Sequence, residues 1–338
     1  MQLDRNADLA PHTTFGVPAR AELLARFTSA QQLRDLLAMP DVKGKPLLVL
    51  GGGSNVLFTR DYPGLVLLNQ VPGMEVLDEN DDHVVLRAGA GVDWHALVLH
   101  TVAQGWGGLE NLSLIPGKVG AAPMQNIGAY GVELKETFVE LVAFRIADGE
   151  EVRFDAKACA FGYRESFFKR EGRDRFVILS VTFRLRKHPE VNTGYGAIKE
   201  QLKAMGVVEP TVKDVSDAVI AIRRSKLPDP RVLGNAGSFF KNPVVPMAEY
   251  ERIRRDHPDV VGYPAGSDGM KLAAGWLIET AGWKGLRENG EGVHKHQALV
   301  LVNHGGATGS GIHALSGRII ADIKQKFGVE LEREVNVI

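Results

Sequence analysis

The stretch PGKVGAAPMQNIGAYG at 116–131 constrains the fold more than any other part of this sequence. Glycine and alanine recur along it, and it ends in an amide pair, Gln125 and Asn126, followed by Gly128 and Tyr130. Glycine allows a backbone to approach a ligand or another backbone closely. Residues with such small side chains fill a core poorly. We therefore expect this backbone to lie against a large flat ligand or its pyrophosphate. A purely structural role is the alternative.

A second glycine cluster, GGGSN at 51–55, directly follows the buried-type strand LLVL at 47–50. Backbone amides of such a cluster bind phosphate, and Ser54 and Asn55 add donors. The cluster has neither the spacing of G-x-G-x-x-G nor the lysine of a P-loop. It therefore indicates a nucleotide held in a different cradle, with a plain turn after the strand as the alternative.

A third stretch, GNAGSFFKNP at 234–243, suits neither a helix nor a regular strand. Gly237 permits a turn with positive φ, which would hold out the hydroxyl of Ser238. The local alternative is a loop whose two phenylalanines, Phe239 and Phe240, fill the core.

Composition excludes several classes of protein. The chain has 338 residues, 44% of them hydrophobic, and a net charge of −1, so it has no electrostatic footprint for nucleic acid or an anionic membrane. No apolar run is long enough to span a bilayer, and Met1–Arg5 shows no basic start of a secretory signal. The single Cys159 cannot form an internal disulfide, so we expect a cytoplasmic protein.

Hydrophobic periodicity predicts alternating helices and strands. Helices are expected over 29–39, 93–104, 212–224, 271–281 and 312–327. Strands are expected over 47–50, 65–69, 74–77, 84–86, 138–146, 151–154, 176–185, 297–302 and 331–338, with a hairpin turn at Asp148-Gly149. The character of the sequence changes near 70 and again near 205, which indicates an α/β unit, a β-rich region and a third region.

Five motifs together resemble the UDP-N-acetylenolpyruvoylglucosamine reductase family. They are GGGSN at 51–55, PGKVGAAPMQNIGAYG at 116–131, YRES at 163–166, GNAGSFFKNP at 234–243 and LEREV at 331–335, in family order. The resemblance implies an α+β fold: an FAD-binding fold of the vanillyl-alcohol-oxidase/PCMH type, with two α+β subdomains, and a C-terminal α+β substrate-binding domain. We expect subdomains at 1–70 and 71–204, the substrate domain at 205–328, and a C-terminal strand at 329–338 that carries Glu334 back to the active site.

The family reaction is the NADPH-dependent reduction of UDP-N-acetylglucosamine enolpyruvate to UDP-N-acetylmuramate through FAD, a step of peptidoglycan synthesis on which cell shape and division depend. The resemblance implies a hydride to C3 of the enolpyruvyl group and a proton from Ser238 to C2. Arg164 suits a carboxylate better than lysine would, because its guanidinium binds in a bidentate fashion. Glu334 would assist Arg164 or act as a protonated acid. Taken alone, Arg164 is typical of a surface ion pair, and Glu334 of an exposed strand face shared with Glu330 and Glu332.

The resemblance also assigns binding residues. Those for noncovalent FAD are Gly51, Gly52, Gly53, Ser54, Asn55, Pro116, Gly117, Gly120, Ala121, Gln125, Asn126, Gly128, Ala129 and Tyr130. Those for the substrate are Tyr163, Tyr195, Lys226, Asn242 and Gln297. Tyr195 lies between glycines, as in a mobile flap, and marks the family form with a tyrosine loop. NADPH would share the substrate's site, and we expect a monomer.

Other features leave alternatives open. Lys241, Asn242 or a water could make the hydroxyl of Ser238 acidic enough. His294 and His296 would alternate on one strand face, but no third ligand stands at metal spacing, so no metal is expected. Cys159 is expected to be a small buried hydrophobe. An oxidase of the same fold and a nonenzymatic nucleotide-binding protein are the competing functions.

Overall fold

The chain forms two compact units, each discontinuous in sequence. The computed structural model describes residues 2–338, so Met1, with which the expected first domain begins, lies outside the described residues. The first unit contains the residues before Asp8 together with Ala21–Gly52 and Pro63–Ser225. The second contains Asp8–Arg20, Gly53–Tyr62 and Lys226–Ile338. The main division therefore falls after Ser225 rather than near 205, and two short N-terminal segments join the C-terminal unit.

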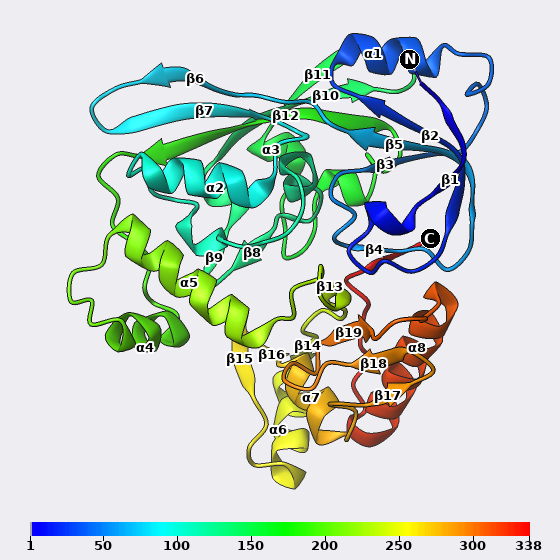
Figure 1. Cartoon of the computed structure of the whole chain (residues 1–338). Coiled ribbons are helices and arrows are strands. Elements are labelled where there is room, and N and C mark those ends of the chain that lie inside the picture. The colour runs from blue at the N-terminus through cyan, green and yellow to red at the C-terminus, as the bar shows by residue number, and fades with distance from the viewer. Residues whose placement is uncertain (1) are drawn as a thin grey trace. The chain divides into compact units, whose positions relative to one another are not determined.

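The first unit begins with a four-stranded sheet in the order β1-β2-β5-β3 (Figure 1). Its strands are β1 (Asp4–Asp8), β2 (Arg20–Phe27), β3 (Leu47–Leu50) and β5 (Tyr62–Asn69), and β3 runs parallel to β5. Helix α1 (Ala30–Leu37) begins where the hydroxyl of Ser29 accepts a hydrogen bond from the backbone N–H of Gln32. It buries Leu33 and Leu36 against this sheet.

The second sheet of this unit is antiparallel, in the order β11-β10-β12-β7-β6. Its strands are β6 (Met74–Glu79), β7 (His83–Gly89), β10 (Phe138–Arg145), β11 (Glu151–Asp155) and β12 (Phe176–Arg186). Helix α2 (Trp94–Ala103), capped by the carboxylate of Asp93, covers one face and buries Trp94 among apolar strand residues. On the other face Phe144 packs with α1, which joins the two sheets into one body.

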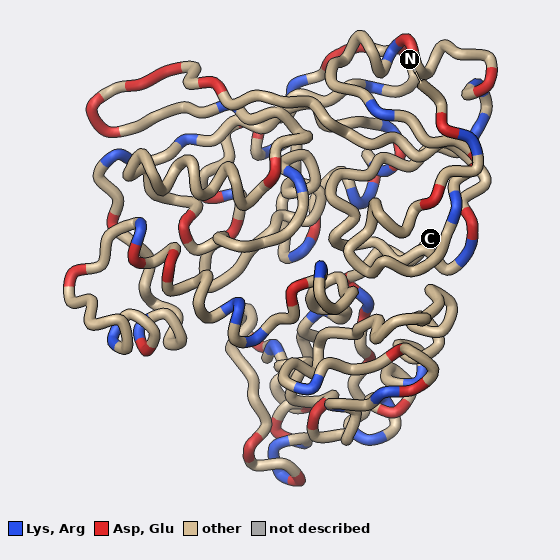
Figure 2. The backbone as a smooth tube through the Cα atoms, in the orientation of Figure 1, with Lys and Arg blue, Asp and Glu red and all other residues tan. Residues whose placement is uncertain are grey.

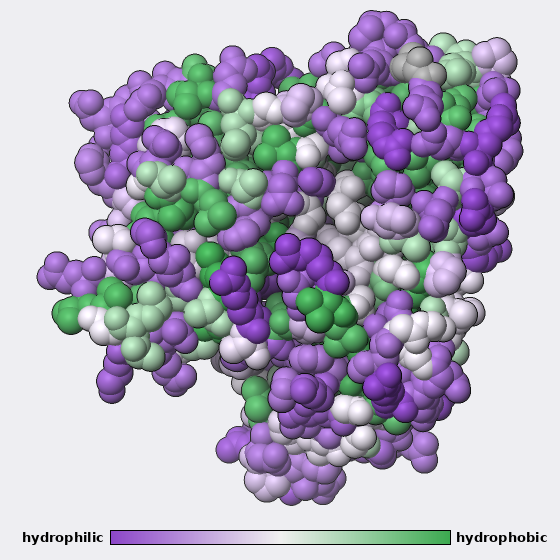
Figure 3. All heavy atoms as spheres, in the orientation of Figure 1, coloured by the Kyte–Doolittle hydropathy of each residue, from purple (hydrophilic) through white to green (hydrophobic). Residues whose placement is uncertain are grey.

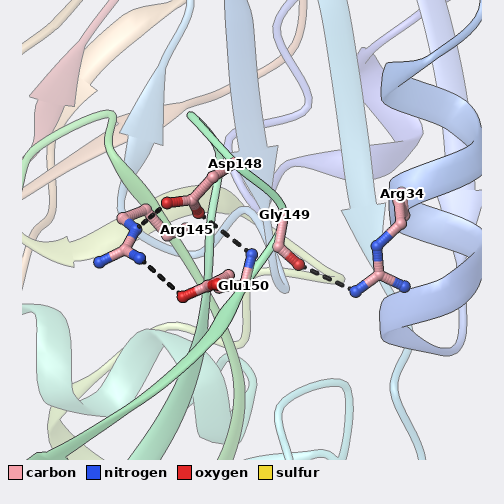
Figure 4. Close-up of polar contacts among 5 residues, drawn as sticks. All are labelled: Arg34, Arg145, Asp148, Gly149 and Glu150. Carbon is pink, nitrogen blue, oxygen red and sulfur yellow. Dashed lines mark hydrogen bonds and ion pairs between the residues drawn. The ribbon is translucent and has the colours of Figure 1, made fainter.

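The turn between β10 and β11 confirms the predicted hairpin (Figure 4). Arg145 donates from Nε to Oδ2 of Asp148 over 2.7 Å and from Nη2 to Oε2 of Glu150 over 3.0 Å. The carbonyl of Gly149 accepts a 2.9 Å hydrogen bond from Nη2 of Arg34 in α1. The side chain of Arg145 thus fixes the hairpin, and the carbonyl of Gly149 ties it to helix α1.

The rest of the first unit consists of short elements and a helical hairpin. The short elements are the 3-10 helix η3 (Val119–Gln125), β8 (Gly128–Ala129), β9 (Val132–Glu133), the 3-10 helix η4 (Leu134–Glu136) and α3 (Ala156–Cys159). Helices α4 (Gly196–Ala204) and α5 (Val212–Lys226) pack through Ile198, Val215 and Val219.

The second unit contains two small sheets, a further two-stranded pairing of β4 (Val56–Leu57) with β20 (Asn336–Val337), three α-helices and the 3-10 helix η1 (Ala10–His12). One sheet has the order β13-β19-β18-β17 and the other β14-β16-β15. Their strands are β13 (Gly234–Ser238), β14 (Val244–Pro246), β15 (Gly262–Ala265), β16 (Gly269–Leu272), β17 (Arg287–Glu288), β18 (Glu291–Val293) and β19 (Val300–Asn303). The helices are α6 (Met247–Asp256), α7 (Ala274–Thr280) and α8 (Gly309–Phe327).

Both short N-terminal segments are integral to this second unit. Phe15, Val17 and Leu57 are buried in the same core as Phe239, Ile312 and other residues of the C-terminal part. In addition, β4 (Val56–Leu57) pairs in parallel with β20 (Asn336–Val337). The segments therefore supply core residues and a strand partner that residues 226–338 do not contain.

Three predicted elements were wrong in type or extent. The helix expected over 271–281 begins only at Ala274, because Lys271 and Leu272 belong to β16. The strand expected over 297–302 begins at Val300, and the terminal strand of 331–338 is reduced to β20 and an isolated bridge at Arg333. The stretch 234–243 does contain a strand, β13, but an irregular one: its register shifts between Asn235 and Ser238, and Gly237 has the predicted positive φ, +70°.

Basic and acidic residues are interspersed along the chain, with an acidic run at the turn between β6 and β7 (Figure 2). On the face in view in Figure 3, hydrophobic residues are scattered among hydrophilic ones. Within residues 2–338, none of the helices combines the length and apolar character needed to cross a bilayer.

Candidate active site

The two glycine-rich stretches predicted to hold a nucleotide lie side by side in the first unit. A Cβ atom on Gly52 would stand 2.9 Å from Cα of Gly117, and one on Gly51 would stand 3.1 Å from Cβ of Lys118. At Gly120 an added Cβ would stand 2.6 Å from Cβ of Ala90. Glycine at 52 and 120 therefore allows neighbouring segments to pack closely, which creates a surface poor in side chains. Such a surface fits an extended dinucleotide such as FAD.

The remainder of the GGGSN cluster belongs to the second unit. Gly53 has a φ of +57°, and a Cβ there would lie 2.0 Å from the carbonyl oxygen of His12. Nδ2 of Asn55 donates to the backbone oxygen of Glu334 over 3.2 Å, and the carbonyl of Asn55 accepts from the backbone N–H of Asn336 over 3.1 Å. This half of the cluster thus holds the segment that carries Glu334.

Arg164 is fixed against the second glycine-rich stretch. It lies in the left-handed region with φ +53°, and its Nη2 donates to the carbonyl of Gly128 over 2.7 Å. Its Cζ lies 5.5 Å from the ring centroid of Tyr163, a distance typical of a cation–π contact. A half-buried guanidinium held in this way is suited to receive a carboxylate.

The structure brings Ser238 and Glu334 onto paired segments of the second unit. The N–H of Glu334 donates to the carbonyl of Phe239 over 2.8 Å, and that of Lys241 to the carbonyl of Glu332 over 2.9 Å. Glu334 is half-buried, whereas Glu332 is exposed. The alternative that Glu334 lies on an exposed strand face together with Glu332 is therefore wrong.

Arg333 anchors the same segment on its other side. Because side chains alternate along extended backbone, it points away from Glu332 and Glu334. Its Nε donates to Oγ of Ser316 in α8 over 2.7 Å. The segment is thus held by backbone bonds to Phe239 and by a side-chain bond to a long helix.

The two sequence neighbours proposed to activate Ser238 both have protein partners. Lys241 forms an ion pair with Glu332, and Oδ1 of Asn242 accepts from the N–H of Ala274 over 3.0 Å. Gln297 lies beside Gly275, where an added Cβ would stand 3.2 Å from its Oε1. Asn242 and Gln297, both predicted to bind substrate, are therefore brought together at the start of α7.

The tyrosine loop rests on the glycine-rich stretch. The rings of Tyr130 and Tyr195 meet edge to face, with centroids 5.3 Å apart. Burial raises the pKa of Tyr130, and the nearby Arg223 opposes that shift. Lys226, another residue predicted to bind the substrate, is exposed at the end of α5.

Sequence reasoning missed Asn111, which supports this loop. Its side chain is buried, and Nδ2 donates to the carbonyls of Tyr130 over 3.2 Å and Asn192 over 2.9 Å. It thereby joins the glycine-rich stretch to the segment that leads to Tyr195. A single asparagine in a loop carries no sequence signal for such a role.

The histidine pair does not lie on a strand, contrary to expectation. His294 and His296 lie in the bend between β18 and β19, with ring centroids 5.6 Å apart. Burial lowers the pKa of His294. Among residues 2–338, no three His, Cys, Asp or Glu side chains are grouped to hold a metal. Cys159 is buried, as expected, and burial raises the pKa of its thiol to about 12.

Comparison with known proteins decides the family. The model of an FAD binding domain matches residues 21–155, and that of the UDP-N-acetylenolpyruvoylglucosamine reductase C-terminal domain matches 229–338. The UDP-N-acetylenolpyruvoylglucosamine reductase of Burkholderia cenocepacia is 56% identical over 96% of this chain and 94% of its own. The chain belongs to the UDP-N-acetylenolpyruvoylglucosamine reductase family.

Further relatives of this reductase family agree. The enzyme of that name from Pseudomonas aeruginosa is 51% identical over 100% of this chain and 99% of its own. The crystal structure of UDP-N-acetylenolpyruvylglucosamine reductase from Thermus caldophilus superposes with a TM-score of 0.69 at 24% identity, covering 100% of this chain and 99% of the other, and so shows the same fold. The protein is a flavin-dependent oxidoreductase of peptidoglycan synthesis, with the expected α+β fold of an FAD-binding region and a C-terminal domain.

Proposed function

We propose that this protein catalyses the NADPH-dependent reduction of UDP-N-acetylglucosamine enolpyruvate to UDP-N-acetylmuramate. The observation that carries the proposal is the backbone pairing of residues 239–241 with 332–334. It holds a hydroxyl, Ser238, and a half-buried carboxyl, Glu334, on adjoining segments. A reduction that needs a proton donor and a group that stabilises a carboxylate requires such a pair.

FAD would be held noncovalently by the glycine-rich stretches at 51–55 and 116–121 and by residues 128–130. When bound, FAD supplies the two-electron chemistry that passes the hydride of NADPH to the substrate. The closely packed backbone of Gly52 and Gly117 supports this assignment, because it leaves amides rather than side chains to meet a pyrophosphate.

The chain's own residues would manage the charge and the proton. Addition of a hydride to C3 of the enolpyruvyl group leaves an electron pair at C2, which delocalises into the adjacent carboxylate. Arg164 would bind that carboxylate, with Glu334 assisting, and stabilise the added charge. The O–H bond of Ser238 then breaks as the C2–H bond forms, and solvent returns a proton to the serine oxygen. One hydride and one proton are consumed for each product.

The remaining assignments concern binding. Tyr163, Tyr195, Lys226, Asn242 and Gln297 would contact the sugar nucleotide, and NADPH would use the same site before it. Lys226 suits a diphosphate as an exposed point charge at a helix end. We propose that the protein acts in the cytoplasm, because both cosubstrates are highly charged and do not cross a bilayer unaided. We also propose that it is a monomer.

An anaerobic experiment tests this function. Purified protein should keep a flavin absorbance after desalting, lose it on addition of NADPH, and regain it promptly on addition of UDP-N-acetylglucosamine enolpyruvate. Regain only with O₂ would indicate an oxidase, and loss of the flavin on desalting would indicate a nonenzymatic protein.

The same assay tests Ser238. Ser238→Ala should leave reduction by NADPH unchanged and slow reoxidation by the enolpyruvyl substrate by about 10²–10⁴-fold, the contribution typical of a general acid. Ser267→Ala, in the exposed turn between β15 and β16, is the matched control and should change neither step. Unchanged reoxidation in Ser238→Ala would show that another group supplies the proton.

A further inference from the structure

Asn126 has a side chain that is fully committed to the protein. The residue is completely buried and adopts the left-handed conformation with φ +43° at the end of η3. Its Nδ2 donates to Oε2 of Glu133 over 3.0 Å and to the carbonyl of Gly162 over 3.1 Å. Its Oδ1 accepts from the backbone N–H of Lys135 over 3.1 Å. An asparagine amide has two N–H donors, so both are used within the protein.

One of these bonds reaches the base of the turn that carries Arg164. The backbone N–H groups of Gly162 and Glu165 donate to each other's carbonyls over 3.0 and 3.3 Å. This reciprocal pair closes a tight turn whose tip consists of Tyr163 and Arg164. Because Asn126 binds the carbonyl of Gly162, it fixes the turn at its base.

A second bond, to Glu133, reaches the strand that faces the guanidinium's own acceptor, and the third binds the N–H of Lys135 in the 3-10 helix η4 that follows. Glu133 in β9 pairs with Gly128 in β8, and Gly128 is the residue whose carbonyl receives Nη2 of Arg164. Asn126 therefore contacts both supports of Arg164. One is the turn from which Arg164 extends, and the other is the β8–β9 pair to which the guanidinium of Arg164 binds. Movement of either end would shift the guanidinium.

We propose that Asn126 is a positioning residue for Arg164 and not a ligand of FAD. The inference rests on the proposed function, because it takes from that function the role of Arg164 toward the substrate carboxylate. It revises the sequence-based assignment of Asn126 to the cofactor, since a completely buried amide with both donors used has none to offer a ligand.

The test uses Asn126→Gly in the full-length holoenzyme. Glycine keeps the left-handed backbone and removes all three side-chain bonds. The dissociation constant for FAD, followed by fluorescence, and the rate of reduction by NADPH should each stay within about threefold of the parent. The limiting rate of reoxidation by UDP-N-acetylglucosamine enolpyruvate should fall at least about tenfold, as expected when one or more buried hydrogen bonds that position a catalytic group are lost. The substrate concentration for half-maximal rate should change less.

Asn289→Gly is the matched control. Asn289 also adopts the left-handed conformation, with φ +46°, but lies exposed in the turn between β17 and β18. It should leave both half-reactions unchanged. A fall in reoxidation shared by the control would show that the effect comes from backbone flexibility, and would overturn the proposal.

A second variant, Asn126→Asp, gives a signature that loss of structure would not produce, and it carries the test should Asn126→Gly not fold. The new carboxyl would face Glu133, which is paired with Lys135 at 2.7 Å and whose N–H donates to Glu136. The charged residues of the turn packed against it are Arg164, Glu165 and the nearby Lys169. Protonation of the new carboxyl restores one donor, so reoxidation should recover partly as the pH falls from 8 to 6. No recovery relative to the parent would count against the proposal.

The outcomes separate this inference from the function on which it rests. If the enolpyruvyl substrate does not reoxidise the parent protein, the proposed function fails. If it does but Arg164→Met leaves reoxidation unchanged, the role of Arg164 fails, and the positioning role of Asn126 fails with it. If Arg164→Met slows reoxidation but Asn126→Gly does not, the positioning role alone is overturned. If Asn126→Gly weakens FAD binding more than about tenfold, Asn126 is a cofactor ligand and the proposal is again overturned.

Discussion

The substitution Asn336→Pro tests how firmly the segment carrying Glu334 is docked. Asn336 makes two hydrogen bonds to the carbonyl of Asn55, one from its backbone N–H over 3.1 Å and one from Nδ2 over 3.0 Å. Proline removes both donors, whereas Asn336→Ala removes only the second. Each bond contributes about 0.5–1.5 kcal/mol, and the exposed position places both in the lower half of that range. The expected loss is about 1.5 kcal/mol, roughly tenfold in the docking equilibrium.

Hydrogen exchange at the backbone amide of Glu334 measures this equilibrium directly. That amide is bound to the carbonyl of Phe239 and becomes accessible when the segment opens. Exchange should rise about tenfold in Asn336→Pro and about two- to threefold in Asn336→Ala. Reoxidation by the enolpyruvyl substrate should slow in the same order, while reduction by NADPH should not change. Equal protection of the Glu334 amide in the two variants would refute the reasoning that β20 holds Glu334 in place.

Two further predictions concern stability. Gly53→Ala should lower the free energy of unfolding in urea by more than about 3 kcal/mol, because a methyl group there would stand 2.0 Å from the carbonyl oxygen of His12. The control Gly206→Ala has a similar φ, +73°, but open space around it, so it should lower that free energy by only about 1–2 kcal/mol, the cost of a left-handed alanine. Equal losses in the two variants would contradict the packing argument. The pKa of His294 lies below the ordinary 6.5, so the unfolded chain binds more protons and stability should fall as the pH drops below about 6.5. His294→Gln should flatten that fall in melting temperature between pH 7 and 5.5. Parallel curves for the parent and the variant would exclude His294 as the source.

The sequence predicted correctly those secondary-structure elements that are fixed by residues close to them in the chain. The Asp148-Gly149 turn and the helix capped by Ser29 depend on residues within a few positions, and both formed as predicted. The start of α7 at Ala274 depends on the side chain of Asn242, which is distant in sequence, and was therefore misplaced.

The same distinction applies to the candidate site. Motif composition singled out Ser238, Arg164 and Glu334, but not how they are held. The support of Arg164 by Asn126 depends on tertiary contacts with Gly162 and Glu133, to which no periodicity points. Residues 8–20 and 53–62 are too short to reveal from pattern alone that they belong to the C-terminal unit.

The discontinuity of the second unit has a consequence in time. Asn55, beside β4, must wait for its partner Asn336, in β20, which is translated 281 residues later. At about 5–20 residues per second, that wait is about 15–60 s on the ribosome. During it Phe15, Val17 and Leu57, all buried in the finished core, have no partners from the C-terminal part, while residues 63–225 can already fold. Synthesis therefore leaves these apolar side chains exposed for about 15–60 s, and this is the interval in which chaperone binding would have its largest effect.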